Sequence, residues 1–334
     1  MAGFSGPGWL VLMALDINLF WNQNFMKFYV GVTNDEWYYN LKNIKPDEVN
    51  FWRPSSTTQF KAIPIGAPFL FKLHSPNNFI VGGGFFFRHE ILPVGLVWET
   101  FGEKNGFSNI NGFIKILAKI THSPVYNSSL IGCTILTQPF FFEKDNWIEQ
   151  PSNWANGIMV GKTYDTEAND QIGSYVWDRV RMLLEKYNSV GSEKDLIPMT
   201  EINPNDYNLY LTKMRIGQGA FRVWVTDEYH KKCAVSGEKT LPVLEAAHIK
   251  PYSSSGPNSI KNGILLRSDL HILFDKNYLT ITNDYKLEVS KRIKDEFENG
   301  KDYYKYQGKP VILPSSPSSY PDPEFIEYHN NLFR

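Results

Sequence analysis

Four polar side chains between residues 246 and 275 are of types that can hydrolyse a phosphodiester bond. They are His248, Asn262, His271 and Asp275. An imidazole has a pKa near neutrality, so it can take a proton from water and make that water nucleophilic. A divalent cation held nearby would stabilise charge on the phosphate and on the leaving oxygen. These residue types therefore predict metal-assisted hydrolysis, provided that the fold brings them together.

The local sequence predicts a β-hairpin that carries the first two of these side chains. The apolar run 241–245 predicts a strand that delivers His248 to its end or to the turn beyond it. Residues 264–266 predict a second strand, and a Pro/Ser/Gly-rich loop separates the two strands. Asn262 and Gly263 predict a turn with positive φ before the second strand, because glycine adopts that conformation without strain.

A helix is predicted to follow the hairpin directly. Ser268 or Asp269 can cap it, since both side chains accept hydrogen bonds from the first free backbone amides. His271 and Asp275 are then four residues apart on one helical face. A strand, a loop and a helix would thus bring an imidazole beside a group of metal ligands.

This stretch resembles the His-Asn-His (HNH) nucleases of the ββα-metal fold, and more narrowly those found in bacterial restriction endonucleases. The resemblance covers residues 207–295, and many separate positions agree in order and spacing. The matching positions are Arg215, Gly217, Gln218, Phe221, Arg222, Tyr229, 233–237, 245–251, Asn262, Gly263, Leu265, Leu266, 269–271, Phe274 and Asp275.

The resemblance implies a role for each residue of the motif. His248 is the general base, Asn262 orients the base and its loop, and His271 binds the metal ion. The implied metal is Mg²⁺ or Mn²⁺, with Zn²⁺ or Ni²⁺ as alternatives. The resemblance further implies that HNH enzymes cutting both strands act as dimers, because one active site cuts one strand, so a homodimer is expected.

The remaining metal ligands are less uniform among these nucleases. Asp275 stands where many members carry a second ligand. Many members also have a metal-binding Asp or His directly before the general base, where this chain has Ala247. Glu245 is therefore the candidate ligand from the first strand.

Charge and composition bound how the protein could meet nucleic acid. The 334 residues carry a formal net charge of −1, so no overall positive field draws in DNA, and basic groups would have to be sorted onto one face. Aromatic residues make up 15% and could stack on exposed bases, although core packing is their usual role. The candidate DNA contacts in the nuclease segment are Arg215, Gln218, Arg222 and Lys250.

The N-terminal segment is predicted to be rich in strands. Runs at 28–32, 68–73 and 79–87 have strand-like composition, and Gly82 to Gly84 inside the last run indicate a bulge or a close backbone approach. The segment resembles, more weakly, the PUA-like domains, a superfamily with modules that read modified bases. The expected fold is therefore α+β, with a PUA-like, β-barrel-like N-terminal domain and a C-terminal ββα-metal nuclease domain.

PUA-like readers commonly hold a flipped base between aromatic rings. The aromatic candidates for such a pocket are Trp37, Phe51, Trp52 and Trp98, and core packing is the alternative for each of them. Arg53 and Ser55 could contact phosphate or base edges. Trp52 and Arg53 are the favoured pair, because residues 50–55 are expected to form a loop between strands.

Composition shifts predict four segments along the chain. An extension occupies residues 1–25, in which the apolar run 9–15 is short and lacks the basic start of a signal peptide. The reader spans 26–170, a helix and polar linker span 171–206, and the HNH nuclease spans 207–334. Two cysteines, no secretory signal and no membrane-length apolar run predict a cytoplasmic location without membrane contact.

The sequence thus predicts a metal-dependent endonuclease of the restriction type, acting on double-stranded DNA near a modified base such as methylated or hydroxymethylated cytosine. Three alternatives stay open. The protein could be a non-catalytic DNA-binding protein that uses the HNH fold for docking, a restriction enzyme for an unmodified site, or an enzyme acting on RNA. The first strand ligand, the metal, the cut position and the recognised base do not follow from the sequence.

Overall fold

The computed structural model describes residues 26–54, 58–166, 169–189 and 216–333. The chain divides into two compact units. The first contains Met1–Lys45, Phe60–Phe87 and Gln138–Met214; the second contains Pro46–Gln59, Arg88–Thr137 and Arg215–Arg334. The second unit therefore combines part of the segment predicted as a reader with the whole described part of the predicted nuclease.

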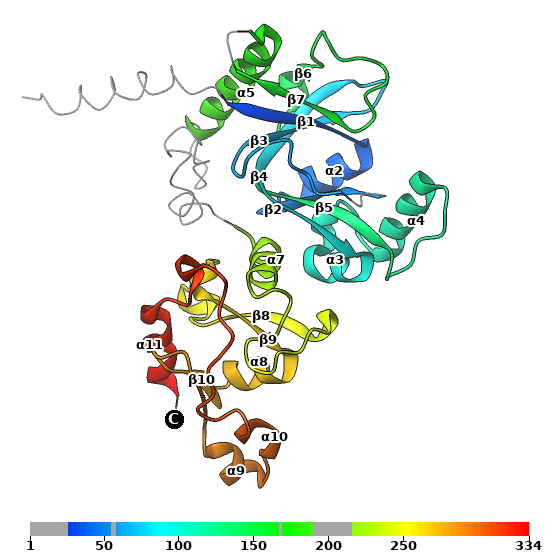
Figure 1. The fold of residues 1–334 in the computed structure, drawn as a ribbon. Coiled ribbons are helices and arrows are strands. Elements are labelled where there is room, and N and C mark those ends of the chain that lie inside the picture. The colour runs from blue at the N-terminus through cyan, green and yellow to red at the C-terminus, as the bar shows by residue number, and fades with distance from the viewer. Residues whose placement is uncertain (1–25, 55–57, 167–168, 190–215, 334) are drawn as a thin grey trace, which may run out of the picture. The chain divides into compact units, whose positions relative to one another are not determined.

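A seven-stranded mixed sheet dominates the N-terminal half of the chain (Figure 1). Its order is β2-β5-β4-β3-β1-β7, with β6 paired to β4. The pair β1–β3 is parallel, and β1–β7, β2–β5 and β3–β4 are antiparallel. The elements are β1(Lys27–Thr33), α2(Asp35–Ile44), β2(Glu48–Arg53), β3(Pro68–Leu73), β4(Phe79–Pro93), α3(Val94–Phe101), α4(Ile110–Thr121), β5(Leu130–Phe141), β6(Ile148–Glu149), β7(Gly161–Asp165) and α5(Gln171–Ser189).

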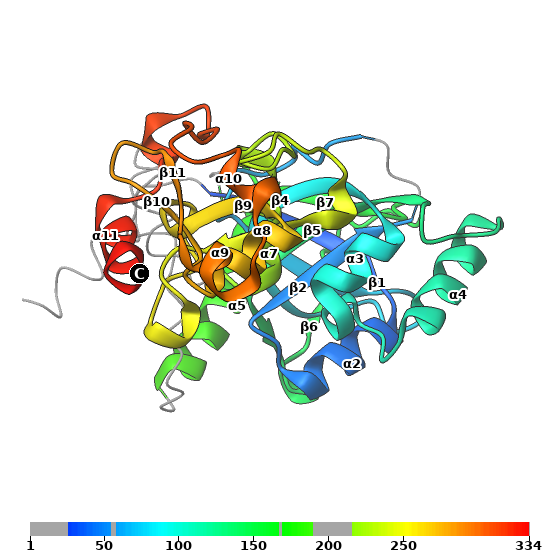
Figure 2. The same ribbon diagram turned by 90° about the horizontal axis from the view of Figure 1, so that it is seen from below.

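The C-terminal part of the second unit has two short hairpins and five α-helices among its described residues. Its elements are α7(Gln218–Glu228), β8(Leu244–His248), β9(Gly263–Arg267), α8(Ser268–Asp275), β10(Leu279–Ile281), β11(Leu287–Val289), α9(Arg292–Phe297), α10(Lys301–Tyr304) and α11(Pro323–Leu332). Strands β8 and β9 pair antiparallel, with His248 opposite Gly263. Helix α8 follows β9 directly and lies against the hairpin in both views (Figures 1 and 2). This is the predicted ββα arrangement.

The core of the first unit is aromatic. Asn34 caps helix α2, and its side chain accepts a hydrogen bond from the backbone amide of Trp37. That cap places Trp37 on the buried face, where its ring packs edge-on against Phe71 of β3. The side chains of β3 are buried on both faces, which is why its sequence is a continuous apolar run.

The fold confirms the α+β class and corrects three local expectations. Residues 48–53 form strand β2, so Trp52 and Arg53 lie on a strand and not in a loop. Gly263 has a φ of −116°, and its missing Cβ instead makes room for Val225. Helix α8 begins after Arg267 without a side-chain cap, so neither Ser268 nor Asp269 has the predicted capping role.

None of the described helices is both long and apolar enough to cross a membrane.

The glycines of β4 are required by close backbone contact. A Cβ on Gly82 would lie 2.3 Å from the carbonyl oxygen of Phe140, and the oxygen is backbone, so it cannot rotate away. A Cβ on Gly83 would lie 2.8 Å from the carbonyl oxygen of Phe69. Strand β4 therefore tolerates no side chain at either position, as the triple glycine predicts.

We expect Gly82→Ala to lower the free energy of unfolding by about 1–3 kcal/mol, because the added methyl group overpacks a closed site. Urea unfolding followed by circular dichroism would measure this change. Gly157→Ala is the matched control, since a Cβ there has no atom within 4 Å. Equal stabilities of the two variants would contradict the close contact at Gly82.

Candidate active site

His248 ends strand β8 with its ring fixed by two neighbours. The ring of Phe221 on α7 stacks on it, with centroids 4.1 Å apart and planes 16° apart. Nε2 of His248 lies 2.8 Å from Oδ1 of Asn258. Nδ2 of Asn258 in turn donates to the carbonyl oxygen of Ile216, at 2.8 Å. A side chain held by a stacked ring and a hydrogen bond has one defined orientation.

The bond to Ile216 also determines which ring nitrogen of His248 carries the proton. A carbonyl oxygen only accepts, so the amide group of Asn258 must turn Nδ2 toward Ile216 and Oδ1 toward His248. Oδ1 likewise only accepts, so Nε2 of His248 bears the hydrogen. Nδ1 is then the nitrogen with the lone pair, which is the atom that a general base needs.

The surroundings keep His248 neutral. Burial lowers its pKa below the ordinary 6.5, and the positive charge of His271 lowers it further. The hydrogen bond with Asn258 and the negative charge of Asp275 oppose this effect without reversing it. A neutral imidazole at neutral pH can accept a proton, and the mutual influence places the two histidines within electrostatic reach.

Asn262 is completely buried and fastens the loop that follows β8. Its Oδ1 accepts from the backbone amide of Lys250 at 2.8 Å, and its Nδ2 donates to the carbonyl oxygens of Lys250 and Pro257 at 3.0 Å. Asn262 thus holds both ends of this loop. The partner that accepts the hydrogen bond from the ring of His248 is Asn258, a residue that no sequence pattern singles out.

His271 on α8 lies between two carboxylates. Its Nδ1 is 2.6 Å from Oε2 of Glu245, and its Nε2 is 3.3 Å from Oδ2 of Asp275. Burial alone would lower the pKa of His271, but its hydrogen bonds with Asp275 and Glu245 outweigh burial and raise it. Burial likewise raises the pKa of Glu245, yet hydrogen bonds from His271 and Ser268 bring the net value below normal.

The donor set suits a hard divalent cation only in part. Nε2 of His271 and Oδ2 of Asp275 are close enough to bind one ion, and imidazole and carboxylate are common ligands for Mn²⁺ and Zn²⁺. Glu245 is hydrogen-bonded to the opposite ring nitrogen, Nδ1, and thereby orients the ring of His271. No three His, Cys, Asp or Glu side chains of the described ranges converge as a metal-binding group. Water and a phosphate oxygen would have to complete the coordination.

The four aromatic residues proposed for the reader differ in burial: two are buried and two are half-buried. Trp37 is 1% exposed and Phe51 is 5% exposed, so both are core residues here and cannot stack on a base. Trp52 and Trp98 are half-buried and both pack on Phe113, with centroids 5.6 and 6.2 Å away. The indole Nε1 of Trp52 donates to a backbone carbonyl, so its edge is anchored.

The polar reader candidates have different outcomes. Arg53 is half-buried beside His89, whose pKa falls to about 4 through burial and through the charge of Arg53. Ser55 lies outside the described residues, as does Arg215 of the nuclease segment. Arg53 is therefore the polar residue of this group with a described position.

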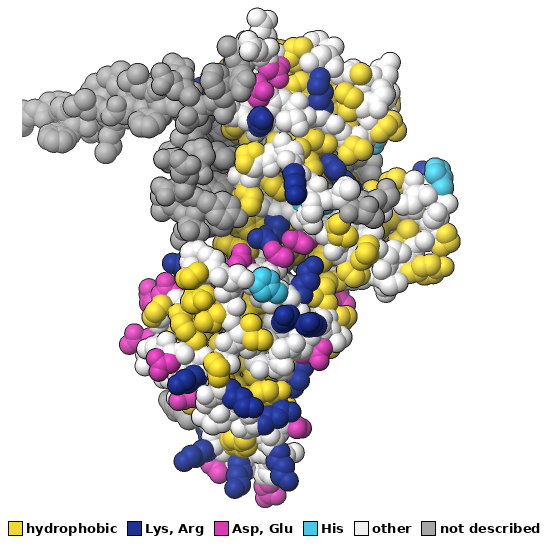
Figure 3. All heavy atoms as spheres, viewed as in Figure 1, with side chains coloured by type: hydrophobic (Ala, Val, Ile, Leu, Met, Phe, Trp, Pro, Cys, Tyr) yellow, Lys and Arg dark blue, Asp and Glu magenta, His cyan; other side chains and the backbone are white. Residues whose placement is uncertain are grey.

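Three further candidate DNA contacts lie on the nuclease elements. Gln218 is exposed, Arg222 is half-buried on α7, and Nζ of Lys250 lies 5.1 Å above the ring of Tyr328. In the view of Figure 3, Lys and Arg side chains are most frequent near α9 and α10, with Asp and Glu among them. Arg292, for example, pairs with Glu296 at 2.7 Å. This face is mixed in charge.

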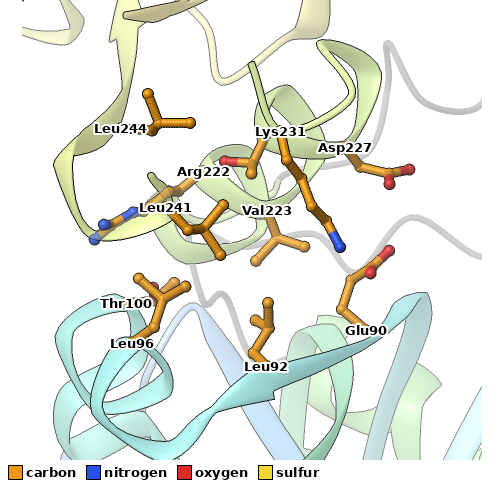
Figure 4. Close-up of a pocket in the computed structure, with 11 residues that line it drawn as sticks. Glu90, Leu92, Leu96, Thr100, Arg222, Val223, Asp227, Lys231, Leu241 and Leu244 are labelled. Atoms are coloured by element: carbon orange, nitrogen blue, oxygen red, sulfur yellow. The ribbon is translucent and has the colours of Figure 1, made fainter. Parts of the chain in front are cut away.

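Helix α7 also borders a small cavity within the second unit (Figure 4). Its volume is about 20 Å³, which is room for one water molecule. Leucine and valine side chains face one another across it, and Glu90, Asp227 and Lys231 lie along one side. The cavity is too small for a nucleobase, so it is a packing feature of α7.

The family model of the HNH endonucleases matches residues 233–282, the segment that contains His248, Asn262, His271 and Asp275. This segment is an HNH endonuclease domain, and the protein is accordingly a nuclease, an enzyme that hydrolyses phosphodiester bonds. No curated protein matches the chain.

Several solved structures are similar to this chain. The modification-dependent restriction endonuclease TagI shares 14% identity, with 86% of this chain and 75% of that chain covered and a TM-score of 0.26. An ASCH protein from Zymomonas mobilis shares 12% identity over 35% of this chain and 74% of that chain, with a TM-score of 0.25. A point mutant of a Zymomonas mobilis ASCH protein shares 10% identity over 49% of this chain and 99% of that chain, with a TM-score of 0.28.

We expect substitutions of Asn258 to move the acid limb of the pH–rate profile in opposite directions. Asn258→Ala removes a bond that raises the pKa of His248, so the limb should shift to lower pH. The rate should also fall by about tenfold, as when other oriented histidines lose their partner. Asn258→Asp places a negative charge at Nε2 and should shift the limb to higher pH. Identical profiles for both variants would contradict the assigned hydrogen bond.

Proposed function

We propose that this nuclease is a metal-dependent DNA endonuclease of the restriction type that cuts near a modified base. The observation that supports it best is the state of His248: a neutral ring, held in one orientation, with Nδ1 as the proton acceptor and with His271 and Asp275 within electrostatic reach. A domain used only for docking would have no need of this arrangement.

Each residue then has a chemical task. Nδ1 of His248 takes a proton from the attacking water, and Asn258 keeps the hydrogen on Nε2. His271 and Asp275 would hold the cation, and Glu245 orients the ring of His271 through Nδ1. The bound cation would stabilise negative charge on the phosphate and on the leaving oxygen. Asn262 keeps the loop beside the base closed.

Reading of the modified base is assigned to the second unit's part of the sheet. Trp52 on β2 and Trp98 on α3 are half-buried around Phe113, so each keeps some ring surface for stacking. Arg53 follows Trp52 on the same strand. Trp37 and Phe51 are left out, because the core covers them.

We further propose that two copies act together on double-stranded DNA in the cytoplasm. One HNH site can cut only one strand, so a double-strand break needs a second site. Light scattering of the protein with and without a short duplex would show whether a dimer forms.

A cleavage panel tests the proposed function directly. Duplexes that differ only in one cytosine, which is plain, methylated or hydroxymethylated, are incubated with protein and Mg²⁺ or Mn²⁺. We expect cutting of a modified duplex, and we expect His248→Ala to reduce the rate by at least about 100-fold while binding stays within about twofold. The large loss follows from removal of the proton acceptor, and gel-shift titration measures binding.

Other outcomes of the panel point to the other functions. Cutting of plain DNA alone would indicate an unmodified site, and cutting of matched RNA alone would indicate an RNA enzyme. Binding without any cutting, with either metal, would indicate a docking protein. Full activity of His248→Ala would remove this residue from the mechanism.

Metal affinity should depend on pH through His271. Its pKa is raised above 6.5, and only the neutral ring can bind a cation, so Mn²⁺ affinity should fall as pH drops through that raised pKa. Glu245→Gln removes one carboxylate that raises the pKa, so the fall should begin at lower pH. Above that raised pKa, where the wild-type ring is neutral, His271→Ala should bind Mn²⁺ about 10- to 100-fold more weakly than the wild type. Isothermal calorimetry measures each case, and a pH-independent affinity would argue against His271 as a ligand.

A further inference from the structure

A buried carboxylate holds the start of the helix that packs on His248. The side chain of Glu48 on β2 is 0% exposed. Its Oε1 accepts from the backbone amide of Gly219 and its Oε2 from that of Ala220, both at 2.8 Å. Nζ of Lys104 lies 2.9 Å from Oε1 and balances the charge. Charge-assisted bonds at the positive end of a helix are among the stronger polar contacts in proteins.

The sequence at the start of α7 is shaped around this carboxylate. A Cβ on Gly217 would lie 2.3 Å from Cδ of Glu48, and a Cβ on Gly219 would lie 2.8 Å from its Oε1. Neither glycine has positive φ among the described backbone, so close approach is the reason for both. Gly217 and its neighbour Gln218 are among the positions at which the sequence resembles the HNH nucleases, yet the hydrolytic chemistry itself does not use them.

The same end of α7 carries both contacts that fix the general base. Phe221, one residue after Ala220, stacks on the ring of His248. The carbonyl oxygen of Ile216, just before the helix, holds Asn258, which holds Nε2 of His248. A shift of this helical turn would move the stacked ring and the hydrogen-bond partner together.

We propose that Glu48, balanced by Lys104, is a positioning residue for the nuclease: it fixes the start of α7 and thereby the ring of His248. This inference rests on the proposed function, and it adds a residue far outside the matched segment 233–282. Glu48 stands at the beginning of the strand that carries Trp52 and Arg53. The strand assigned to base reading is thus also the strand that holds the catalytic base in place.

The test uses the full chain and a signal that does not depend on cleavage. Stacking on Phe221 shifts the ring protons of His248 upfield, and NMR of protein with labelled histidines detects this shift; the protein has seven histidines, and His248→Ala assigns the signal. Glu48→Gln keeps the shape but turns an NH₂ group toward one helix amide. We expect it to lose most of the upfield shift and to cut modified DNA about 10- to 100-fold more slowly, with binding nearly unchanged. Glu48→Asp, which keeps the charge, should restore part of both.

Asp170→Asn is the matched control, because Asp170 accepts from the amide of Gly173 at the start of α5 in the other unit. It should lower stability while leaving the His248 signal and the cleavage rate unchanged. A folded Glu48→Gln protein with an unchanged His248 signal would overturn the proposal. So would equal losses of the His248 signal and of the cleavage rate in Glu48→Gln and in Asp170→Asn. If the wild type cuts nothing, the proposed function fails, and the His248 signal alone still decides the role of Glu48.

Discussion

The orientation of a single imidazole ring, that of His248, is the constraint on which the chemistry depends. The strand and hairpin deliver the residue, but they do not fix the ring. Phe221 supplies a stacking surface, and Asn258 supplies an acceptor whose own orientation is forced by a carbonyl oxygen. The result is a chain of contacts in which each polar group has one permitted partner, so the proton position on the ring follows from geometry.

The other end of the site is stabilised in a comparable way. His271 lies between two carboxylates, and the helix that carries it is braced by the C-terminal helix α11. His329 on α11 stacks on Phe274, with centroids 3.9 Å apart, and its Nε2 donates to the carbonyl oxygen of the same residue. Asp275 directly follows Phe274, so a helix beyond the matched segment 233–282 fixes the place of one metal-binding candidate. The catalytic motif is short, but the structure that makes it rigid is not.

Sequence patterns predicted what depends on local periodicity and missed what depends on packing. The apolar runs 68–73 and 264–266 lie in strands because burial on a sheet requires that pattern, whereas the strand predicted at 241–245 begins only at Leu244 and ends at His248. Residues 50–55 were expected to form an aromatic and basic loop between strands, yet pairing with β5 makes residues 48–53 a strand. Trp37 and Phe51 were candidates for a base-binding pocket with core packing as the alternative, because composition alone does not distinguish a stacking ring from a core ring. Asn258 had no signal, since its role requires a loop to fold back over ten residues.

The buried carboxylate of Glu48 helps to explain why strand β2 and the nuclease helix α7 belong to one unit. Removing a charge from water is costly, and apolar replacements of buried ion pairs are often equally or more stable. A charged cap is therefore a poor choice if stability alone were required. It does specify direction, because only the start of a helix presents two free amides to one carboxylate. Lys104, which also pairs with Asp47, places a positive charge beside this carboxylate without competing for those amides. The contact thus fixes which turn of α7 meets β2, and that turn is the one that holds Phe221 against His248.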